Sequence, residues 1–319
     1  MARRGIDAVF VTDDQEAQSL ARAQGIRIKW RLGKHRRPVR VPYYHERMTS
    51  RFVDRLPDSG EPNVSHFDSP RITLQFHPNW PHKGRWVIDS MAADGAYRSQ
   101  FETGVSNGGL TAFVGGERWR WESRLFEGRY DDAPVSARPI YGTWNRRFDP
   151  YGGAIRFGSS YLRLRPETTG RSTFCFPDSA LEPADVGGPD LLPHLSRMAD
   201  NSGLDHLNEY VEAHVHGGVR FDTDVESVVL DPCFAGTDVE DAALRLGCQV
   251  EFHPGFRASP DDFDPEFRGP HIVELARLLG NELTPCVVGE AARAGEHPPQ
   301  HIKQVWHCLA RFGRTSLDA

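Results

Sequence analysis

Residues 72–78 read Ile-Thr-Leu-Gln-Phe-His-Pro, and this stretch decides the fold class. Apolar and polar residues alternate over 72–76, which predicts a half-buried strand that ends at His77-Pro78. Apolar residues within 86–91 then predict a short helix that ends at Asp94-Gly95. A strand, a loop, a helix and a glycine turn in this order mark the start of a folded domain.

The same two periodicities recur farther along the chain. Alternation predicts strands over 160–164, 172–176, 210–216 and 225–230, and the turn between the first two predicts a hairpin. Helices are expected over 119–125, 271–279 and 300–312. No regular element is expected in 100–109, and 178–204 is polar and rich in glycine. These elements predict an α+β fold, with a mainly antiparallel β core over 65–235 and a helical C-terminal region over 236–319.

The first 64 residues are expected to form a basic arm and a linker. A short helix is predicted over 11–25, and seven basic residues lie between positions 27 and 40 of an otherwise acidic chain. Residues 55–70 are rich in proline and polar residues, which is typical of a linker. The basic run is either an arm that contacts nucleic acid or another polyanion, or a solvated arm that folds over an acidic body.

The composition excludes several classes of protein. With 319 residues, a net charge of -6 and 39% hydrophobic residues, the chain is neither fully disordered nor fibrous. No window approaches the roughly 18 apolar residues of a membrane span, and no apolar segment follows the charged N-terminus. The five cysteines are scattered and form no Cys-x-x-Cys pair. We therefore expect a cytoplasmic protein that has no Sec signal peptide and no membrane partner.

Several runs of sequence give the chain a family resemblance. They resemble a bacterial family that is catalogued as a domain of unknown function, over roughly residues 65 to 310. Membership in such a family implies no particular reaction. The matching runs are residues 72–78, 94–104, 106–109, 118–122, 125–126, 156–161 and 212–217.

A more remote resemblance concerns three residues. His77 at a strand end, Tyr161 in a Gly-Ser-Ser-Tyr strand and Glu212 in a late strand are similar in order to the His-Tyr-Glu set of certain ADP-ribosyltransferases. These are the poly(ADP-ribose) polymerase and diphtheria-toxin type, which share a split antiparallel sheet around an NAD cleft. The resemblance implies a split sheet here as well. It further implies that His77 binds the adenosine ribose, Tyr161 stacks on nicotinamide, and Glu212 bonds the 2'-hydroxyl of the nicotinamide ribose.

These residue types suit the cleavage of NAD. An oxocarbenium-like transition state carries positive charge, which a fixed carboxylate stabilises, and an aromatic face holds the leaving nicotinamide. One position departs from the polymerase pattern, because Pro78 replaces a glycine whose N–H binds the nicotinamide amide. A toxin branch that begins with arginine and ends in Glu-x-Glu fits less well. Arg71 is available, but Glu209 and Glu212 are three residues apart and cannot share one face of a strand.

Further polar residues are expected to contact NAD. A polar, glycine-rich loop can approach the cofactor phosphates through its backbone, and arginines can neutralise the diphosphate. The alternatives are an ordinary surface loop and ordinary surface ion pairs. The residues concerned are Gln100, Thr103, Ser106 and Asn107 in the loop, with Arg98 and Arg156 as the arginines.

The leading hypothesis is NAD-dependent ADP-ribosyl transfer to a protein, a nucleic acid or another acceptor, with NAD glycohydrolysis as the variant that uses water. No metal is expected in that reaction.

A second hypothesis is a metal-dependent hydrolase, because His214 and His216 are two residues apart in a strand and share a face with Glu212. His77, His82 and His253 are further candidate ligands. A third hypothesis is a non-catalytic module that binds NAD or a partner.

Overall fold

The computed structural model describes residues 70–104 and 112–315. The chain divides into two units, residues 1–58 and 59–319, and all described residues belong to the second unit. The predicted helix over 11–25 and the basic run between positions 27 and 40 lie outside the described residues. Within the described ranges, no helix has the length and apolar character that crossing a bilayer requires.

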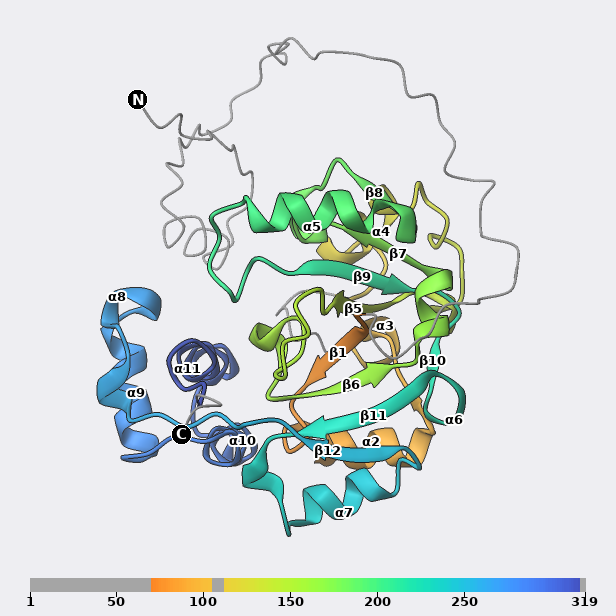
Figure 1. The fold of residues 1–319 in the computed structure, drawn as a ribbon. Helices are drawn as coiled ribbons and strands as arrows, with labels where there is room; N and C mark the ends of the chain where they lie inside the picture. Colours follow the sequence, from red (N-terminus) through yellow and green to blue (C-terminus); the bar gives the residue numbers. More distant parts are fainter. Residues whose placement is uncertain (1–69, 105–111, 316–319) are drawn as a thin grey trace, which may run out of the picture. The chain divides into compact units, whose positions relative to one another are not determined.

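An eight-stranded sheet forms the centre of the second unit, in the order β12-β11-β6-β1-β5-β9-β7-β8 (Figure 1). Neighbouring strands are antiparallel, except that β11 and β12 are parallel. The strands are β1 (Ile72–Phe76), β5 (Ile140–Trp144), β6 (Ser160–Leu164), β7 (Ser172–Cys175), β8 (Val186–Gly187), β9 (Val211–Val215), β11 (Val225–Leu230) and β12 (Gln249–Phe252). Two short ribbons pair β2 (Pro81–His82) with β3 (Arg85–Trp86), and β4 (Ala96–Tyr97) with β10 (Val219–Arg220).

The sheet is split between β1 and β5. These two strands pair only at Ile72 with Trp144 and at Thr73 with Thr143. In contrast, β6 pairs with β1 as far as Phe76, and β9 pairs along all of β5. Beyond the Thr73–Thr143 pair the two halves of the sheet therefore diverge, and we call this point the fork. The α+β class and the split, mainly antiparallel core are confirmed.

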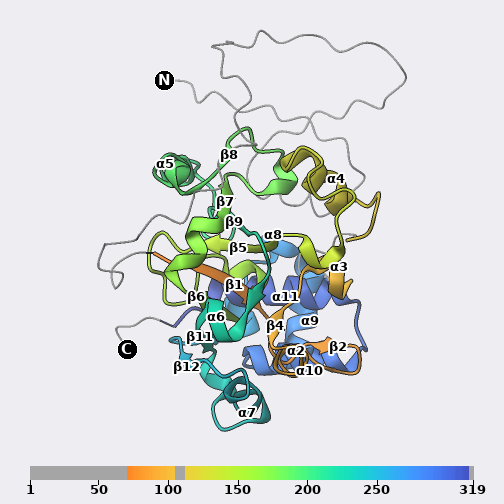
Figure 2. The same ribbon diagram turned by 90° about the vertical axis from the view of Figure 1, so that its right-hand side faces the viewer.

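The two faces of the sheet differ in polarity. One face carries apolar side chains such as Leu74, Leu162 and Val228, and these pack against α2, α5 and α7 in a single buried cluster. The opposite face carries Thr73, Tyr161 and other polar residues, and we call it the polar face. Figure 2 shows α5 and α4 on opposite sides of β7 and β9. The period-2 alternation of each strand thus separates an apolar core from a polar surface that other segments cover.

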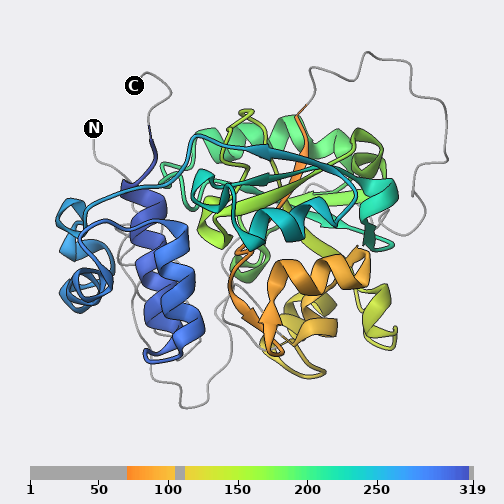
Figure 3. The ribbon, with the colours of Figure 1, turned by 90° about the horizontal axis from the view of Figure 1, so that it is seen from below.

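The helices surround the sheet, and those of the C-terminal region gather beside it (Figure 3). A second apolar cluster joins α9, α10 and α11 to Tyr151 and Ile155 of the loop that follows β5. The helices are α2 (Val87–Asp94), α3 (Gln100–Thr103), α4 (Glu117–Leu125), α5 (Leu192–Asp200), α6 (Phe221–Asp224), α7 (Asp238–Leu244), α8 (Pro265–Arg268), α9 (Pro270–Leu279), α10 (Pro285–Ala294) and α11 (Pro299–Phe312).

The strands and helices predicted within the described residues are confirmed. Elements such as β5, β12, α7 and α10 were not predicted, and three further points differ. The predicted hairpin of β6 and β7 is wrong, because the two strands lie in different halves of the sheet and the connection between them is the 3-10 helix Pro166–Arg171. The short helix α3 forms where no regular element was expected, because Ser99 and Glu102 make a capping box at its start. Residues 178–204 contain α5, whose buried Leu192 and Leu195 face the sheet.

Gly158 allows the loop after β5 to lie against β1, which gives the first testable prediction. A Cβ atom at residue 158 would be 2.3 Å from the backbone nitrogen and oxygen of Phe76, so the Gly158→Ala substitution forces backbone to move. We expect a loss of about 2–3 kcal/mol in the free energy of unfolding, as is usual for overpacking. Gly170→Ala is the matched control, because nothing lies within 4 Å of a Cβ there. Urea denaturation measures both variants, and equal stability would contradict the packing described.

Candidate functional site

A row of polar side chains crosses the polar face at the fork. The hydroxyl oxygens of Thr73 and Thr143 lie 3.0 Å apart, and Glu212 is the partner of Thr143 on β9. Cys175 is the partner of Glu212 on β7. Because partner residues of antiparallel strands point to the same side of a sheet, this row places the carboxylate of Glu212 beside the point where the two halves separate.

The predicted residues Tyr161 and Glu212 lie on this same face. Tyr161 is the partner of Gln75, which shares its side of β1 with Thr73. The strands β1 and β5 lie between β6 and β9, and the fork separates the half that carries Tyr161 from the half that carries Glu212. His77 follows β1 directly. The three side chains therefore share one region of the fold, and each contacts its own set of neighbours.

His77 is packed between β1 and α11. Its ring stacks on Trp80 at a centroid distance of 4.1 Å and meets the edge of Trp306 at 4.8 Å. Burial, with the charge of Lys303, lowers the pKa of His77 from 6.5 to about 3. The imidazole is therefore neutral near pH 7, and it joins the sheet to the C-terminal helices.

A loop over residues 149–158 covers the polar face between Tyr161 and Glu212. The Tyr161 hydroxyl donates a hydrogen bond to the carbonyl of Pro150 at 3.0 Å, and burial raises the pKa of Tyr161 to about 12. The backbone N–H of Gly153 donates to the Thr73 hydroxyl at 2.9 Å. Tyr161 thus holds the loop on one side, and the loop contacts the row of polar residues at the fork.

Glu212 is a buried carboxylate with strong local support. Its Oε1 accepts hydrogen bonds from His214 Nε2 at 2.9 Å and from the backbone N–H of Ser179 at 3.3 Å. Burial alone raises the pKa of Glu212, but the hydrogen bond and charge of His214 outweigh it and the pKa lies below its ordinary value. Asp178 is also buried, and burial together with Glu212 raises its pKa. The pKa values of these two neighbouring carboxyl groups are therefore shifted in opposite directions.

A chain of hydrogen bonds leads from Glu212 across β9 and β7. His214 Nδ1 lies 3.1 Å from the Thr173 hydroxyl, which lies 3.0 Å from His216 Nε2. His216 Nδ1 lies 2.6 Å from the Tyr130 hydroxyl. Glu212 only accepts, so His214 donates to it through Nε2, and the hydrogen bonds link His214 to Tyr130 through Thr173 and His216. We call these five residues together with Cys175 the β9 cluster.

The predicted metal pair His214 and His216 shares a face, but Thr173 bridges the two rings. Burial, with the charge of His214, lowers the pKa of His216 to about 3, so this ring is neutral. His253 instead lies against the carbonyl of Ser159 at 2.7 Å. Among the described residues, the side chains that converge on a single point for a metal ion are Cys175, Glu212 and His214.

A second layer of charge, not predicted from the sequence, lies beside the β9 cluster. Tyr141 is the partner of His214, and its hydroxyl donates to Glu122 of α4 at 3.1 Å. Glu122 forms a fully buried ion pair with Arg138, and the Arg118 guanidinium lies 5.0 Å from the centre of the Tyr141 ring. Residues 140–144 contain the β-branched and aromatic residues that are common in strands, and this was the available signal for β5.

The predicted NAD contacts fall in separate places. Arg98 is engaged by Asp94 at 3.1 Å and by Glu102 at 3.0 Å on the surface. Arg156 donates to Asn208 at 2.7 Å within the 149–158 loop region. Gln100 and Thr103 belong to α3, and Ser106 and Asn107 lie outside the described residues.

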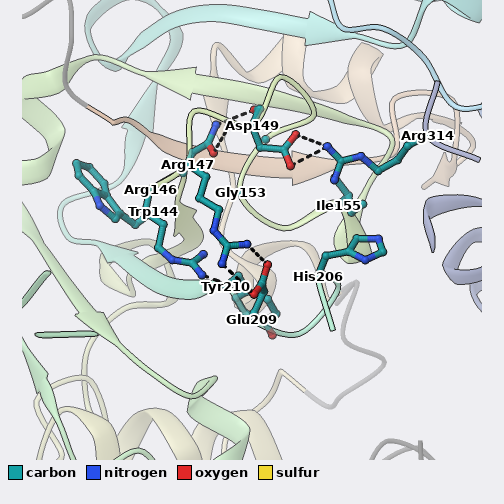
Figure 4. A pocket seen from close by; sticks show the side chains of 12 residues that line it. Trp144, Arg146, Arg147, Asp149, Gly153, Ile155, His206, Glu209, Tyr210 and Arg314 are labelled. Atoms are coloured by element: carbon teal, nitrogen blue, oxygen red, sulfur yellow. Dashed lines mark hydrogen bonds and ion pairs between the residues drawn. The ribbon is translucent and has the colours of Figure 1, made fainter. Parts of the chain in front are cut away.

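A polar groove opens near the other end of β9, and its charges pair with one another (Figure 4). Arg147 pairs with Glu209, and Arg314 binds both oxygens of Asp149 at 2.9 Å. Tyr210 lines this groove, and its hydroxyl donates to Asp178. The groove is therefore connected to the β9 cluster through Tyr210 and Asp178.

The neutral, buried histidines predict a pH-dependent stability. Both His77 and His216 have a pKa of about 3 when folded and 6.5 ordinarily, so the unfolded chain binds more protons between these values. Each ring then removes roughly 1.4 kcal/mol of stability for each pH unit below about 6.5. We expect His216→Asn to flatten the pH profile of the free energy of unfolding between pH 7 and 5. The exposed His194→Asn serves as control, and equal slopes in the two variants would refute the assignment.

Comparison with known proteins gives the family. The model of the family DUF3626, described as a protein of unknown function, matches residues 71–195 and 191–312. These matches cover more than half of the chain and include β1, the fork and the β9 cluster. No curated protein matches the chain. The chain belongs to the DUF3626 family, as the resemblance to a domain of unknown function predicted.

Proposed function

We propose that this protein cleaves NAD at the bond between nicotinamide and ribose and transfers ADP-ribose to an acceptor. One observation carries the proposal: Glu212 is a buried carboxylate with a lowered pKa, and it lies at the fork of a split antiparallel sheet. In the ADP-ribosyltransferases that the His-Tyr-Glu order resembles, a split sheet surrounds the NAD cleft. The combination of this fold with this residue supports the proposal.

The environment of Glu212 suits such a reaction. When the glycosidic bond breaks, its electron pair leaves with nicotinamide, which becomes neutral, and positive charge develops on the ribose. A buried carboxylate that His214 and Ser179 hold in place meets this charge without reorganisation. The acceptor then bonds to the anomeric carbon and loses a proton. Water, a protein side chain, a nucleic acid or a small molecule can serve as this acceptor.

Two tyrosines of the polar face are candidates to stack on nicotinamide. Tyr161 is the residue that the resemblance implies, but its hydroxyl supports the 149–158 loop. Tyr141 belongs to the same half of the sheet as Glu212 and is partly exposed. The Tyr141 hydroxyl is also engaged, by Glu122 at 3.1 Å, so it is the position of Tyr141 on the strand beside β9 that favours it for the role next to the carboxylate.

The proposed reaction takes place in the cytoplasm. All five cysteines are free thiols, which suits a reducing compartment. NAD is then available as the donor. The basic run between positions 27 and 40 supports a polyanionic acceptor such as nucleic acid, for which binding would weaken steeply with salt.

The central prediction concerns nicotinamide release by the full chain. Glu212→Gln keeps the size of the side chain and removes its charge, and we expect release to fall by about 100-fold or more. Glu209→Gln is the matched control, because Glu209 lies three residues away and pairs with Arg147 at the surface. The measurement follows nicotinamide by chromatography, with and without cell lysate, because a dependence on lysate separates transfer from hydrolysis.

Two results would overturn the proposal. One is full nicotinamide release by Glu212→Gln, and the other is no release by the unmodified protein in lysate together with no change in its melting temperature on adding NAD. Thermal unfolding of each variant shows whether the fold is kept. Tyr141→Ala and Tyr161→Ala then compare the two aromatic candidates, with the larger loss expected for Tyr141→Ala.

A further inference from the structure

Three potential metal ligands of different chemistry meet in the β9 cluster. The Cys175 Sγ atom lies 3.8 Å from Glu212 Oε1 and 3.9 Å from His214 Nε2, and the last two atoms lie 2.9 Å apart. Cys175 and His214 are fully buried, and Glu212 is 7% exposed. The sheet itself creates this convergence, since Cys175 is the partner of Glu212 on β7 and His214 lies two residues farther along β9.

The triangle of donor atoms has the size of a zinc site. Zinc binds thiolate sulfur, imidazole nitrogen and carboxylate oxygen at about 2.0–2.3 Å in tetrahedral geometry, which places ligand atoms about 3.3–3.7 Å apart. The three distances between Cys175, Glu212 and His214 differ from this range by only about 0.4 Å or less. A set of one sulfur, one nitrogen and one oxygen favours a borderline ion such as Zn²⁺ over Mg²⁺ or Ca²⁺, which prefer oxygen alone.

The neighbours of His214 complete the arrangement. A histidine that binds a metal through one ring nitrogen usually hydrogen-bonds through the other, and His214 Nδ1 has Thr173 at 3.1 Å for this purpose. The side chains of histidine, threonine and tyrosine can each donate or accept a hydrogen bond. The hydrogen bonds that link His214 to Tyr130 through Thr173 and His216 can therefore reverse their direction without breaking. The second-layer contacts of a zinc ligand are therefore already present.

We propose that Cys175, Glu212 and His214 form a binding site for one zinc ion. The Cys175 thiol loses its proton to solvent, the His214 proton moves from Nε2 to Nδ1, and each side chain donates one electron pair to the ion. The thiolate and the Glu212 carboxylate together neutralise the ion, which removes the cost of burying their charges separately.

The site has a consequence for the proposed function. A zinc ion bound to Glu212 neutralises the carboxylate charge that would stabilise the positively charged ribose. The protein therefore cannot bind zinc at this site and cleave NAD at the same time. Zinc is then an inhibitor of the reaction. This consequence rests on the proposed function, whereas the site itself rests only on the contacts of the three ligands.

The experiment measures metal binding by the full chain after treatment with a chelator. Zn²⁺ is titrated in competition with a coloured chelator, and Co²⁺ serves as a probe because a cobalt–thiolate bond gives an ultraviolet charge-transfer band. We expect one equivalent of either ion and a cobalt–thiolate band in the unmodified protein. Cys175→Ser should lose the band and bind zinc at least 100-fold more weakly. Cys308→Ser replaces another fully buried cysteine, on α11, and should bind as the unmodified protein does.

The outcomes separate the two proposals. Absence of stoichiometric binding, or an equal loss in Cys175→Ser and Cys308→Ser with both variants folded, overturns the zinc site. Suppose that binding depends on Cys175, and that the metal-free protein releases no nicotinamide in lysate and keeps its melting temperature when NAD is added. This result supports the site and overturns the proposed function. Cys175-dependent binding that leaves nicotinamide release unchanged overturns the inhibition. Release that falls with zinc in the unmodified protein, but not in Cys175→Ser, supports both the site and the inhibition.

Discussion

Two residue pairs hold the halves of the sheet together, and the rest of the structure depends on them. Ile72 with Trp144 and Thr73 with Thr143 are the only pairs between β1 and β5, whereas β1 pairs with β6 from Thr73 to Phe76 and β5 pairs with β9 along its whole length. The polar face at this fork cannot be closed by further strand pairing, so other segments must cover it. The 149–158 loop does so over β1, held by the bond from Gly153 to Thr73, and Phe126 lies against His214 on β9.

Because other segments cover the polar face, charged side chains on this face are buried. A carboxylate away from water is costly unless it is hydrogen-bonded and compensated, and Glu212 meets both conditions through His214 and Ser179. The buried carboxylate of Glu122 is compensated in a similar way, by its ion pair with Arg138. Replacing such groups with apolar residues often stabilises a protein, so their presence is better explained by a chemical role than by stability.

Sequence patterns predicted the strands well and their neighbours poorly, for a physical reason. The period-2 alternation of 72–76 or 160–164 fixes which side of a strand is buried, because it reflects only local geometry. The alternation does not show which strand lies beside another, so β6 and β7 were wrongly predicted to form a hairpin. The same limit applies to the site. The spacing of Glu212 and His214 was enough to place them on one face, but Cys175 and Tyr141 reach that face only through pairing with distant strands.

The two proposals for the β9 cluster follow from one electrostatic property. Glu212 and Asp178 are buried together, and burial, with the charge of Glu212, raises the pKa of the Asp178 carboxyl. A buried carboxylate at this position favours a positive charge of suitable size that lies beside it. The ribose is positively charged only in the transition state, whereas a zinc ion remains bound. Both place a positive charge beside Glu212, and they differ mainly in whether Cys175 takes part. The thiol thus distinguishes a site that stabilises a transition state from one that retains a cation.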